Sequence, residues 1–356
     1  MLQAVMDGPD DVPAATRAEA RLMHAWMEMD RSNLTMSQAR RIIAGEMRAA
    51  ARAGYHRVLS RAWSMMAVIY QNGLDADRAE RAYRRAARQA ALAGDAEYEA
   101  DMLLDLVGVG VRSRMPVSDV IAVLDRAMTT ANLSHAQEVR GEQARAYLFA
   151  LQGRFDEARE LMVGAIREAE ERGRVENLTG ALITFGLIEF FAEAYGAARE
   201  HMTASRDIAE AAGMRAWSAF MSARLAHLLM LEGKDDEALA SAELARAALV
   251  GPKPTDPWMR MFVAGAEARI MARRGETAEA LMRARGMVAD AEAAGFEEFP
   301  AIFAPALEDL AEVLAADGQT QEACEVLGRV IAMQRAKENL AGLAKAERAL
   351  ARIAGD

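Results

Sequence analysis

Apolar and small side chains recur along most of the chain at intervals of three and four residues, which places them on one face of an α-helix. Trp63, Ala67 and Tyr70 form one such stripe, and Ala79 and Ala86 belong to the stripe of the following helix. The alanines let two neighbouring helices approach closely, and the aromatic rings fill the space between layers. This pattern predicts helix–turn–helix units of the tetratricopeptide type.

The helix–turn–helix unit recurs down the sequence with glycine at its turn. The turn glycines are Gly153, Gly233, Gly275 and Gly318, and an alanine follows five residues after each of them. Intervals of 40, 40, 42 and 43 residues separate the alanines that open successive second helices, which are Ala158, Ala198, Ala238, Ala280 and Ala323. The period exceeds that of the shorter tetratricopeptide form, so we expect longer helices.

These observations predict an all-α fold, a right-handed superhelical solenoid of about eight tetratricopeptide-like helix pairs with a C-terminal capping helix at about 339–353. Residues 1–15 are interpreted as a leader or the remnant of a preceding helix, and residues 16–356 as a single tetratricopeptide-like repeat domain. The proline-rich stretch 250–257 is interpreted as a bend, because the repeat resumes beyond it.

Composition narrows the classes of partner. The 356 residues carry a net charge of −10, which argues against direct binding of nucleic acid because that normally requires a basic face. The lone Cys324 cannot form an internal disulfide, which favours a reducing compartment. No apolar run is long enough to span a membrane, and the start lacks the features of a signal peptide. We therefore expect a cytoplasmic protein without membrane contact.

Three segments of the repeats, Phe149–Arg159, Ala272–Ala280 and Leu310–Gly318, together with the closing Lys337–Asn339, carry a resemblance. In this order they look like the C-terminal repeat region of bacterial signalling ATPases, whose N-terminal output domain is a class III nucleotide cyclase or a DNA-binding module, as in LuxR/MalT-like regulators. The resemblance implies a sensor region that controls an ATPase, cyclase or DNA-binding output. The chain has no phosphate-binding Gly-x-x-x-x-Gly-Lys-Ser/Thr loop, so no catalytic residue of that family maps onto it.

No residue pattern predicts catalysis, a metal site or a cofactor. None of the five histidines pairs with another histidine or with cysteine at the spacing of metal ligands. Cys324 has no evident activating neighbour, and no pair of carboxylates stands out as an acid and base. We therefore predict that the chain is not an enzyme.

The first helix of each pair lines the concave wall of such a solenoid, so counting back from each repeat alanine marks the residues that face inward. These are Arg140, Gln143, Tyr147, Ile183, Leu187, Phe190, Phe191, Phe220, His227, Met230, Phe262, Arg269 and Arg273, with Glu308 and Glu312 in the eighth unit. The predicted groove is apolar and aromatic in its middle, with arginines on either side. The alternative is that Phe190 and Phe191 pack between units, where the turn near Glu193 lacks a glycine.

The leading functional prediction is a non-enzymatic sensor that binds a peptide, protein segment or small ligand in the groove and controls a signalling or transcriptional output. The second is an assembly scaffold that mediates self-association, as a homo-oligomer, or builds a multiprotein complex. A third, an enzyme on a solenoid scaffold, would need a cluster of acid, base or metal-binding groups that the sequence does not show.

Overall fold

The structure is a computed structural model that describes residues 6, 12–31, 33–130, 132–248 and 257–355. Most of the predicted leader and of the predicted bend at 250–257 lies outside the described residues. Seventeen α-helices and one short 3-10 helix make up the described part. The helices are α2 (Ala14–Asp30), α3 (Met36–Ala53), α4 (His56–Asn72), α5 (Ala76–Leu92), α6 (Ala96–Gly110), α7 (Val117–Met128), α8 (His135–Leu151), α9 (Phe155–Glu171), α10 (Val175–Phe191), α11 (Tyr195–Ala211), α12 (Arg215–Leu231), α13 (Asp235–Ala248), α14 (Pro257–Arg273), α15 (Thr277–Ala293), η1 (Phe296–Glu298), α16 (Pro300–Ala316), α17 (Thr320–Lys337) and α18 (Leu340–Gly355).

Taken in sequence, α2 to α17 form eight consecutive pairs of described helices, and α18 follows as the capping helix. The all-α solenoid expected from the sequence is therefore confirmed. No helix in the described ranges is both long and apolar enough to cross a lipid bilayer.

The turn within each pair explains the glycine–alanine spacing. Gly153, Gly233, Gly275 and Gly318 have φ angles of 78°, 75°, 85° and 80°, a left-handed conformation that glycine adopts without steric cost. Leu74 and Glu193 occupy the same turn position, with φ angles of 57° and 58°. Five residues on, the repeat alanines are 0% exposed because the neighbouring helix passes directly over them. The turn geometry thus belongs to the repeat and is imposed even where glycine is missing.

Contacts divide the chain into two compact units. Unit 1 comprises residues 1–110 and 119–141, and unit 2 comprises residues 111–118 and 142–356, so that the boundaries fall at the end of α6, within α7 and within α8.

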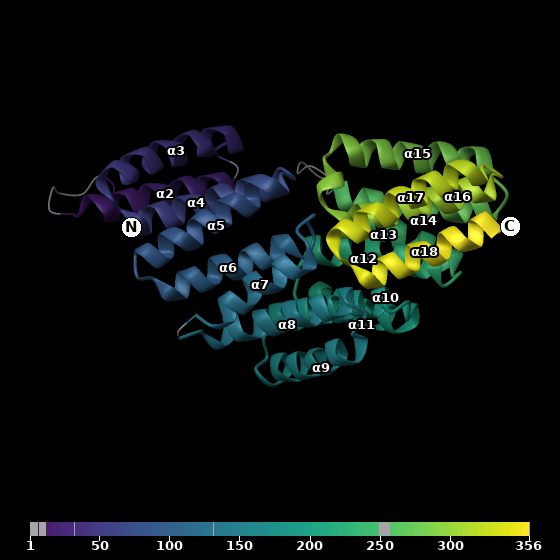
Figure 1. Cartoon of the computed structure of the whole chain (residues 1–356), viewed down its shortest axis with the longest axis horizontal. Helices are drawn as coiled ribbons and strands as arrows, with labels where there is room; N and C mark the ends of the chain where they lie inside the picture. The colour runs from purple at the N-terminus through teal and green to yellow at the C-terminus, as the bar shows by residue number, and fades with distance from the viewer. Residues whose placement is uncertain (1–5, 7–11, 32, 131, 249–256, 356) are drawn as a thin grey trace. The chain divides into compact units, whose positions relative to one another are not determined.

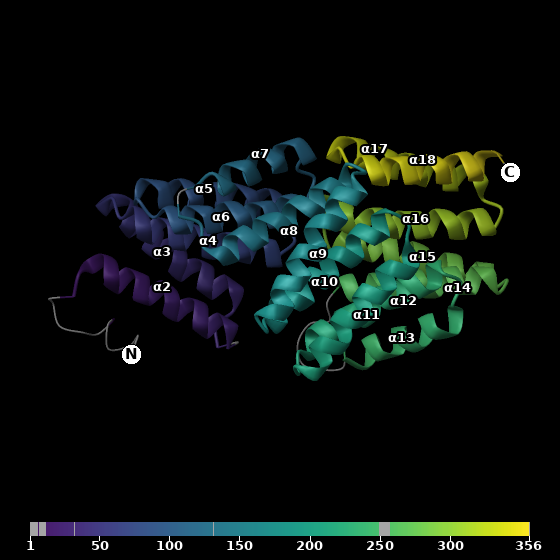
Figure 2. The same cartoon turned by 90° about the horizontal axis from the view of Figure 1, so that it is seen from below.

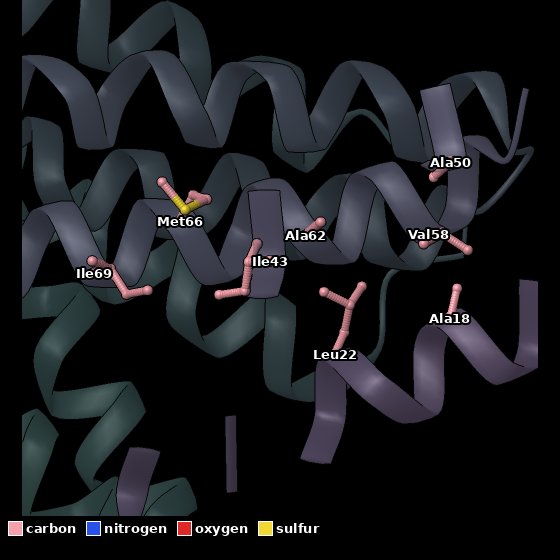
Figure 3. Close-up of a cluster of buried hydrophobic side chains, with 8 residues drawn as sticks. All are labelled: Ala18, Leu22, Ile43, Ala50, Val58, Ala62, Met66 and Ile69. Carbon is pink, nitrogen blue, oxygen red and sulfur yellow. The ribbon is translucent and has the colours of Figure 1, made fainter. Parts of the chain in front are cut away.

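Unit 1 has an apolar core between its first helices. Figure 3 shows Ala18 and Leu22 of α2 pointing to helix α4, which carries Val58 and Ala62. Ile43 of α3 completes this centre, and it is as fully buried as Leu22. Burial of these side chains holds the three helices together.

Unit 2 stacks its pairs in chain order, from α12 and α13 through α14 and α15 to α16, α17 and α18 (Figures 1 and 2). Alanines let α8, α9 and α10 pack closely around the buried side chains of Met162, Phe185 and Ile188. Helix α12 is buried along most of its length because other helices surround it.

Residues 111–118 dock onto the end of α17 through the closing segment Lys337–Asn339. The buried Lys337 ammonium donates to the carbonyl oxygen of Met115, and the Ser118 N–H donates to Glu338 Oε2 at 2.8 Å. The hydrogen bonds from the Ser118 N–H and side chain keep the pKa of the Glu338 carboxyl below its ordinary value. The segment that carried part of the sequence resemblance therefore joins two distant stretches of unit 2.

Candidate functional site

The inner helices of unit 2 converge on a common interior. Helices α8, α10, α12, α14 and α16 all contribute side chains to one small cavity there. Its lining residues are Tyr147, Leu187, Phe190, Phe191, Arg224, His227, Leu228, Phe262, Ala301 and Pro305. These are the first helices of their pairs, and they enclose a narrow space.

Aromatic rings form one wall of this interior. Tyr147 and Phe191 meet edge to face with their centroids 5.7 Å apart, and Phe190 lies 5.9 Å from Phe191. The His227 ring continues the series, 6.3 Å from Phe190 and 5.9 Å from Phe262. These separations are within the range of favourable aromatic packing.

A buried ionic network crosses the interior from α12 to α16. His227 Nε2 lies 2.9 Å from Asp309 Oδ2, and the Arg269 guanidinium lies 3.4 Å from Asp309 Oδ1. Burial by itself would raise the pKa of the Asp309 carboxyl, but His227, Arg269 and Lys345 outweigh it and hold the pKa below its ordinary value. Gly265 of α14 makes room for this carboxylate, since a Cβ there would stand 2.4 Å from Asp309 Oδ2.

Helix α18 closes the interior on the side of α10. Lys345 Nζ bonds Glu308 Oε2 at 2.7 Å and lies 5.0 Å from the centroid of the Phe190 ring. Burial lowers the pKa of the Lys345 ammonium, but Glu308 and neighbouring acidic groups raise it above its ordinary value. At the rim, Arg348 forms an ion pair with Glu193 in the turn after α10. Charged contacts therefore join α18 to α16 and to the turn after α10.

Arg224 lines the cavity with a guanidinium whose hydrogen bonds are not all satisfied. Its guanidinium lies over the Phe262 ring, 4.7 Å from the centroid. Among the side chains that the structure describes, Arg224 Nε is the buried nitrogen or oxygen atom that lacks a hydrogen-bond partner. Burial lowers the pKa of Arg224 to about 10, so the group stays charged near neutral pH. Burial likewise raises the pKa of the neighbouring Tyr147 hydroxyl to about 12, so it stays neutral.

The cavity is small in this arrangement. Its volume is about 20 Å³, which is room for a single water molecule. Sites for drug-sized ligands occupy roughly 300 to 1,000 Å³. A ligand of that size would therefore need the inner helices to move apart.

The structure brings together six of the sequence-predicted site residues around the cavity: Tyr147, Leu187, Phe190, Phe191, His227 and Phe262. Phe190 also belongs to the hydrophobic cluster between α10, α11 and α12, so packing between units, the alternative weighed above, applies to this ring. Phe191 is only partly buried beside it.

The other predicted residues lie elsewhere. Arg140 is in unit 1, where it pairs with Asp105 at 2.6 Å. Met230 is fully buried, and Arg273 reaches the Met230 carbonyl and Asp235. Arg269 joins the Asp309 network described above. Gln143 and Ile183 are partly buried outside the cavity lining, and the Phe220 ring lies tilted against those of Trp217 and Trp258. Glu308 and Glu312 of the eighth unit pair with Lys345 and Arg352 respectively.

Sequence reasoning missed Arg224, Asp309 and Lys345. For Arg224 a signal was present, because it lies between Phe220 and His227 at helical spacing and completes their stripe along α12. No comparable signal marks Asp309, whose partners His227 and Arg269 lie 82 and 40 residues away in sequence.

Among the described residues, no group of three or more histidine, cysteine, aspartate or glutamate side chains is placed to hold a metal ion. The interior offers charge, aromatic surface and hydrogen-bond donors, a combination suited to binding.

Comparisons with known proteins place the fold. No family model matches the sequence, and no curated protein matches it either. Among solved structures, a Rap protein complexed with competence and sporulation factor is similar with a TM-score of 0.71 and 13% identity, over 97% of this chain and 90% of that one. NprR in complex with its cognate peptide NprX gives a TM-score of 0.53 with 15% identity over 82% of each chain. The apo form of RapI gives 0.51 with 12% identity, over 99% of this chain and 89% of the other. These structures are helical repeat proteins of the tetratricopeptide type, and the likeness shows that this chain shares their fold.

Proposed function

We propose that the chain is a peptide-responsive regulatory repeat protein that binds a short peptide in the interior of unit 2. The observation that carries this proposal is the composition of that interior. A repeat that served only as a scaffold would fill it with apolar side chains, because buried charges are costly to desolvate. Here the interior holds the His227–Asp309 pair, the Lys345–Glu308 pair and the incompletely bonded Arg224. Rap and NprR, which share the fold, support a peptide as ligand.

Peptide binding is coupled to opening of unit 2. The cavity of about 20 Å³ cannot hold a peptide, so the bound state separates α18 from α10. The Arg348–Glu193 pair and the contact of Lys345 with Phe190 oppose this opening. A peptide that binds only the open form shifts the population toward it, and this change in curvature is the signal.

The sequence suggests one kind of output for this signal. The segments Phe149–Arg159, Ala272–Ala280 and Leu310–Gly318 resemble repeats of bacterial signalling ATPases. We propose that unit 2 regulates an output of that kind, through an ATPase with a cyclase or DNA-binding domain, in the cytoplasm. Self-association as an assembly scaffold is the competing function.

Native mass spectrometry tests the proposal with pools of short synthetic peptides. Ala301→Leu places a larger apolar side chain in the cavity wall, and Ala278→Leu makes the same change on the exposed face of α15. We expect peptide adducts on the wild type and on Ala278→Leu, and their loss on Ala301→Leu. Thermal melting by circular dichroism verifies that both variants are folded.

Two results would contradict the proposal. Adducts that persist on Ala301→Leu would place binding outside the interior. A wild-type chain that never binds peptide and instead forms a bare multimer, with a mass that rises with concentration, would favour the assembly scaffold.

A further inference from the structure

The Arg224 guanidinium faces an aromatic cavity without a counter-charge. No carboxylate among the described residues forms an ion pair with it, and its Nε atom has neither solvent contact nor a hydrogen-bond partner. The acidic groups of the interior are engaged with other cations. Asp309 pairs with His227 and Arg269, and Glu308 pairs with Lys345.

Burial of the Arg224 Nε atom without an acceptor lowers the stability of the empty chain. A buried donor without an acceptor costs free energy, and the cost is greater when the group is charged. The Phe262 ring beneath the guanidinium offsets part of this cost through a cation–π contact but supplies no hydrogen-bond acceptor at Nε. The planar guanidinium presents donors in a fixed fork that matches a carboxylate in two parallel hydrogen bonds.

We propose that Arg224 is the anchor for a carboxylate group of the peptide that unit 2 binds, an inference that rests on the proposed function. The carboxylate supplies the missing acceptor and the missing negative charge in one group. Tyr147, which lines the same cavity and stays protonated, offers a hydroxyl that can donate to the same anion. The aromatic wall formed by Phe191 and Phe262 then covers the apolar part of the peptide.

A carboxylate can come from the C-terminus of the peptide or from an aspartate or glutamate side chain. Three pools of short synthetic peptides separate these sources. The first has apolar residues and a free C-terminal carboxylate, the second has the same residues and a C-terminal amide, and the third has the amide and one glutamate. If the anchor holds the C-terminus, only the first pool binds tightly. If it holds a side chain, the third pool binds more tightly than the second.

Variants of Arg224 test the residue itself. Arg224→Met should weaken binding of the carboxylate-bearing pool by about ten- to a hundredfold, the usual loss of a charge-assisted hydrogen bond. Arg224→Lys should weaken it less, because the charge stays and the fork is lost. The matched control is Arg285→Met on α15, whose arginine pairs with Glu322 at the surface, and it should bind as the wild type does.

A second measurement separates a binding role from a structural one. Arg224→Met should raise the melting temperature of the empty chain, because a buried donor without a partner is removed. A residue kept for stability would give the opposite result.

The outcomes are distinguishable. Two binding results would overturn the carboxylate anchor while peptide binding stands. One is that the second pool, which has no carboxylate, binds as tightly as the first and third. The other is that Arg224→Met binds the carboxylate-bearing pools as tightly as the wild type does. A fall in the melting temperature of empty Arg224→Met would also overturn it. If no pool binds the wild type, the proposed function fails and the anchor fails with it.

Discussion

In unit 1 the core between α2, α3 and α4 consists of apolar side chains such as Leu22 and Ile43, whereas the interior of unit 2 holds charged and aromatic groups. Among the described residues of unit 1, the buried polar side chains are Ser60 and Gln137, and both are hydrogen-bonded. The buried charged side chains of the described chain belong to unit 2, and they are Glu189, Glu267, Asp309 and Lys337.

This difference supports the proposal that unit 2, unlike unit 1, binds a ligand. Apolar burial accounts for the core of unit 1, and no ligand is needed to explain it. In unit 2 charges are buried where apolar residues would pack at lower cost, and the buried Nε atom of Arg224 lacks a hydrogen-bond partner. Departures from local stability of this kind are expected at functional sites.

Asp309→Asn should have the largest effect. It removes the buried negative charge that Arg269 and His227 contact and should lower the free energy of unfolding of unit 2 by about 3 to 5 kcal/mol. Urea unfolding followed by the fluorescence of Trp217 and Trp258, in a background without the other two tryptophans, measures it. As a control, Asp156→Asn removes an exposed partner of Arg159 and should change stability by less than about 0.5 kcal/mol. Equal effects of the two substitutions would show that the network is not stabilised by its buried charges.

Leu22→Ala is the counterpart in unit 1. It removes a fully buried side chain and should cost about 2 to 5 kcal/mol, through lost burial and the cavity left behind. Trp26 and Trp63 report this unit during urea unfolding. Because the lost interaction is apolar, the deficit should be the same at low and high salt. A strong salt dependence would mean that charges also support unit 1.

Two glycine-to-alanine substitutions compare how much room each unit leaves for an added methyl group. Gly265→Ala would press a methyl group against the Asp309 carboxylate and should destabilise unit 2 by about 1 to 3 kcal/mol. Gly45→Ala, in α3 of unit 1, meets no atom within 4 Å and should stabilise its helix by about 0.5 to 1 kcal/mol. In thermal melting, the melting temperature should fall for Gly265→Ala and rise for Gly45→Ala. Stabilisation by Gly265→Ala would indicate that Asp309 can move away without loss.

The smallest effect is a change in acid sensitivity. The pKa of Asp309 lies below its ordinary value in the folded chain, because His227, Arg269 and Lys345 together outweigh the effect of burial. The stability from this ionised form is complete above the unfolded-state pKa, near 3.8, and is lost as the pH falls through the lower folded-state pKa. Stability of unit 2 against pH, measured between neutral and strongly acidic conditions, should therefore show a shallower acid decline in Asp309→Asn than in the wild type. Identical slopes would exclude Asp309 as a contributor.

Much of the fold could be predicted because it depends on local spacing. Intervals of three and four residues define helix faces, and the glycine-to-alanine interval marks the turn and the close contact that follows it. The structure reproduces these features at Gly153 and Ala158, where φ is 78° and the alanine is 0% exposed. A turn near Glu193 was expected, but the left-handed backbone of Leu74 and Glu193 could not be predicted from residue type, because the packing of the flanking helices imposes it.

The sequence by itself determined the helices, their pairing, the period and six of the residues that line the cavity of unit 2. Only the tertiary structure decided how narrow that interior is, because its width depends on small rotations between successive pairs that no local pattern encodes. It also decided which charges meet there. Lys345 of α18 contacts Phe190 of α10, and Glu193, in the turn after α10, pairs with Arg348 of α18. His227 reaches Asp309 across 82 residues of sequence. The environment of Arg224 was decided in the same way, since the surrounding helices bury its Nε atom without a hydrogen-bond partner.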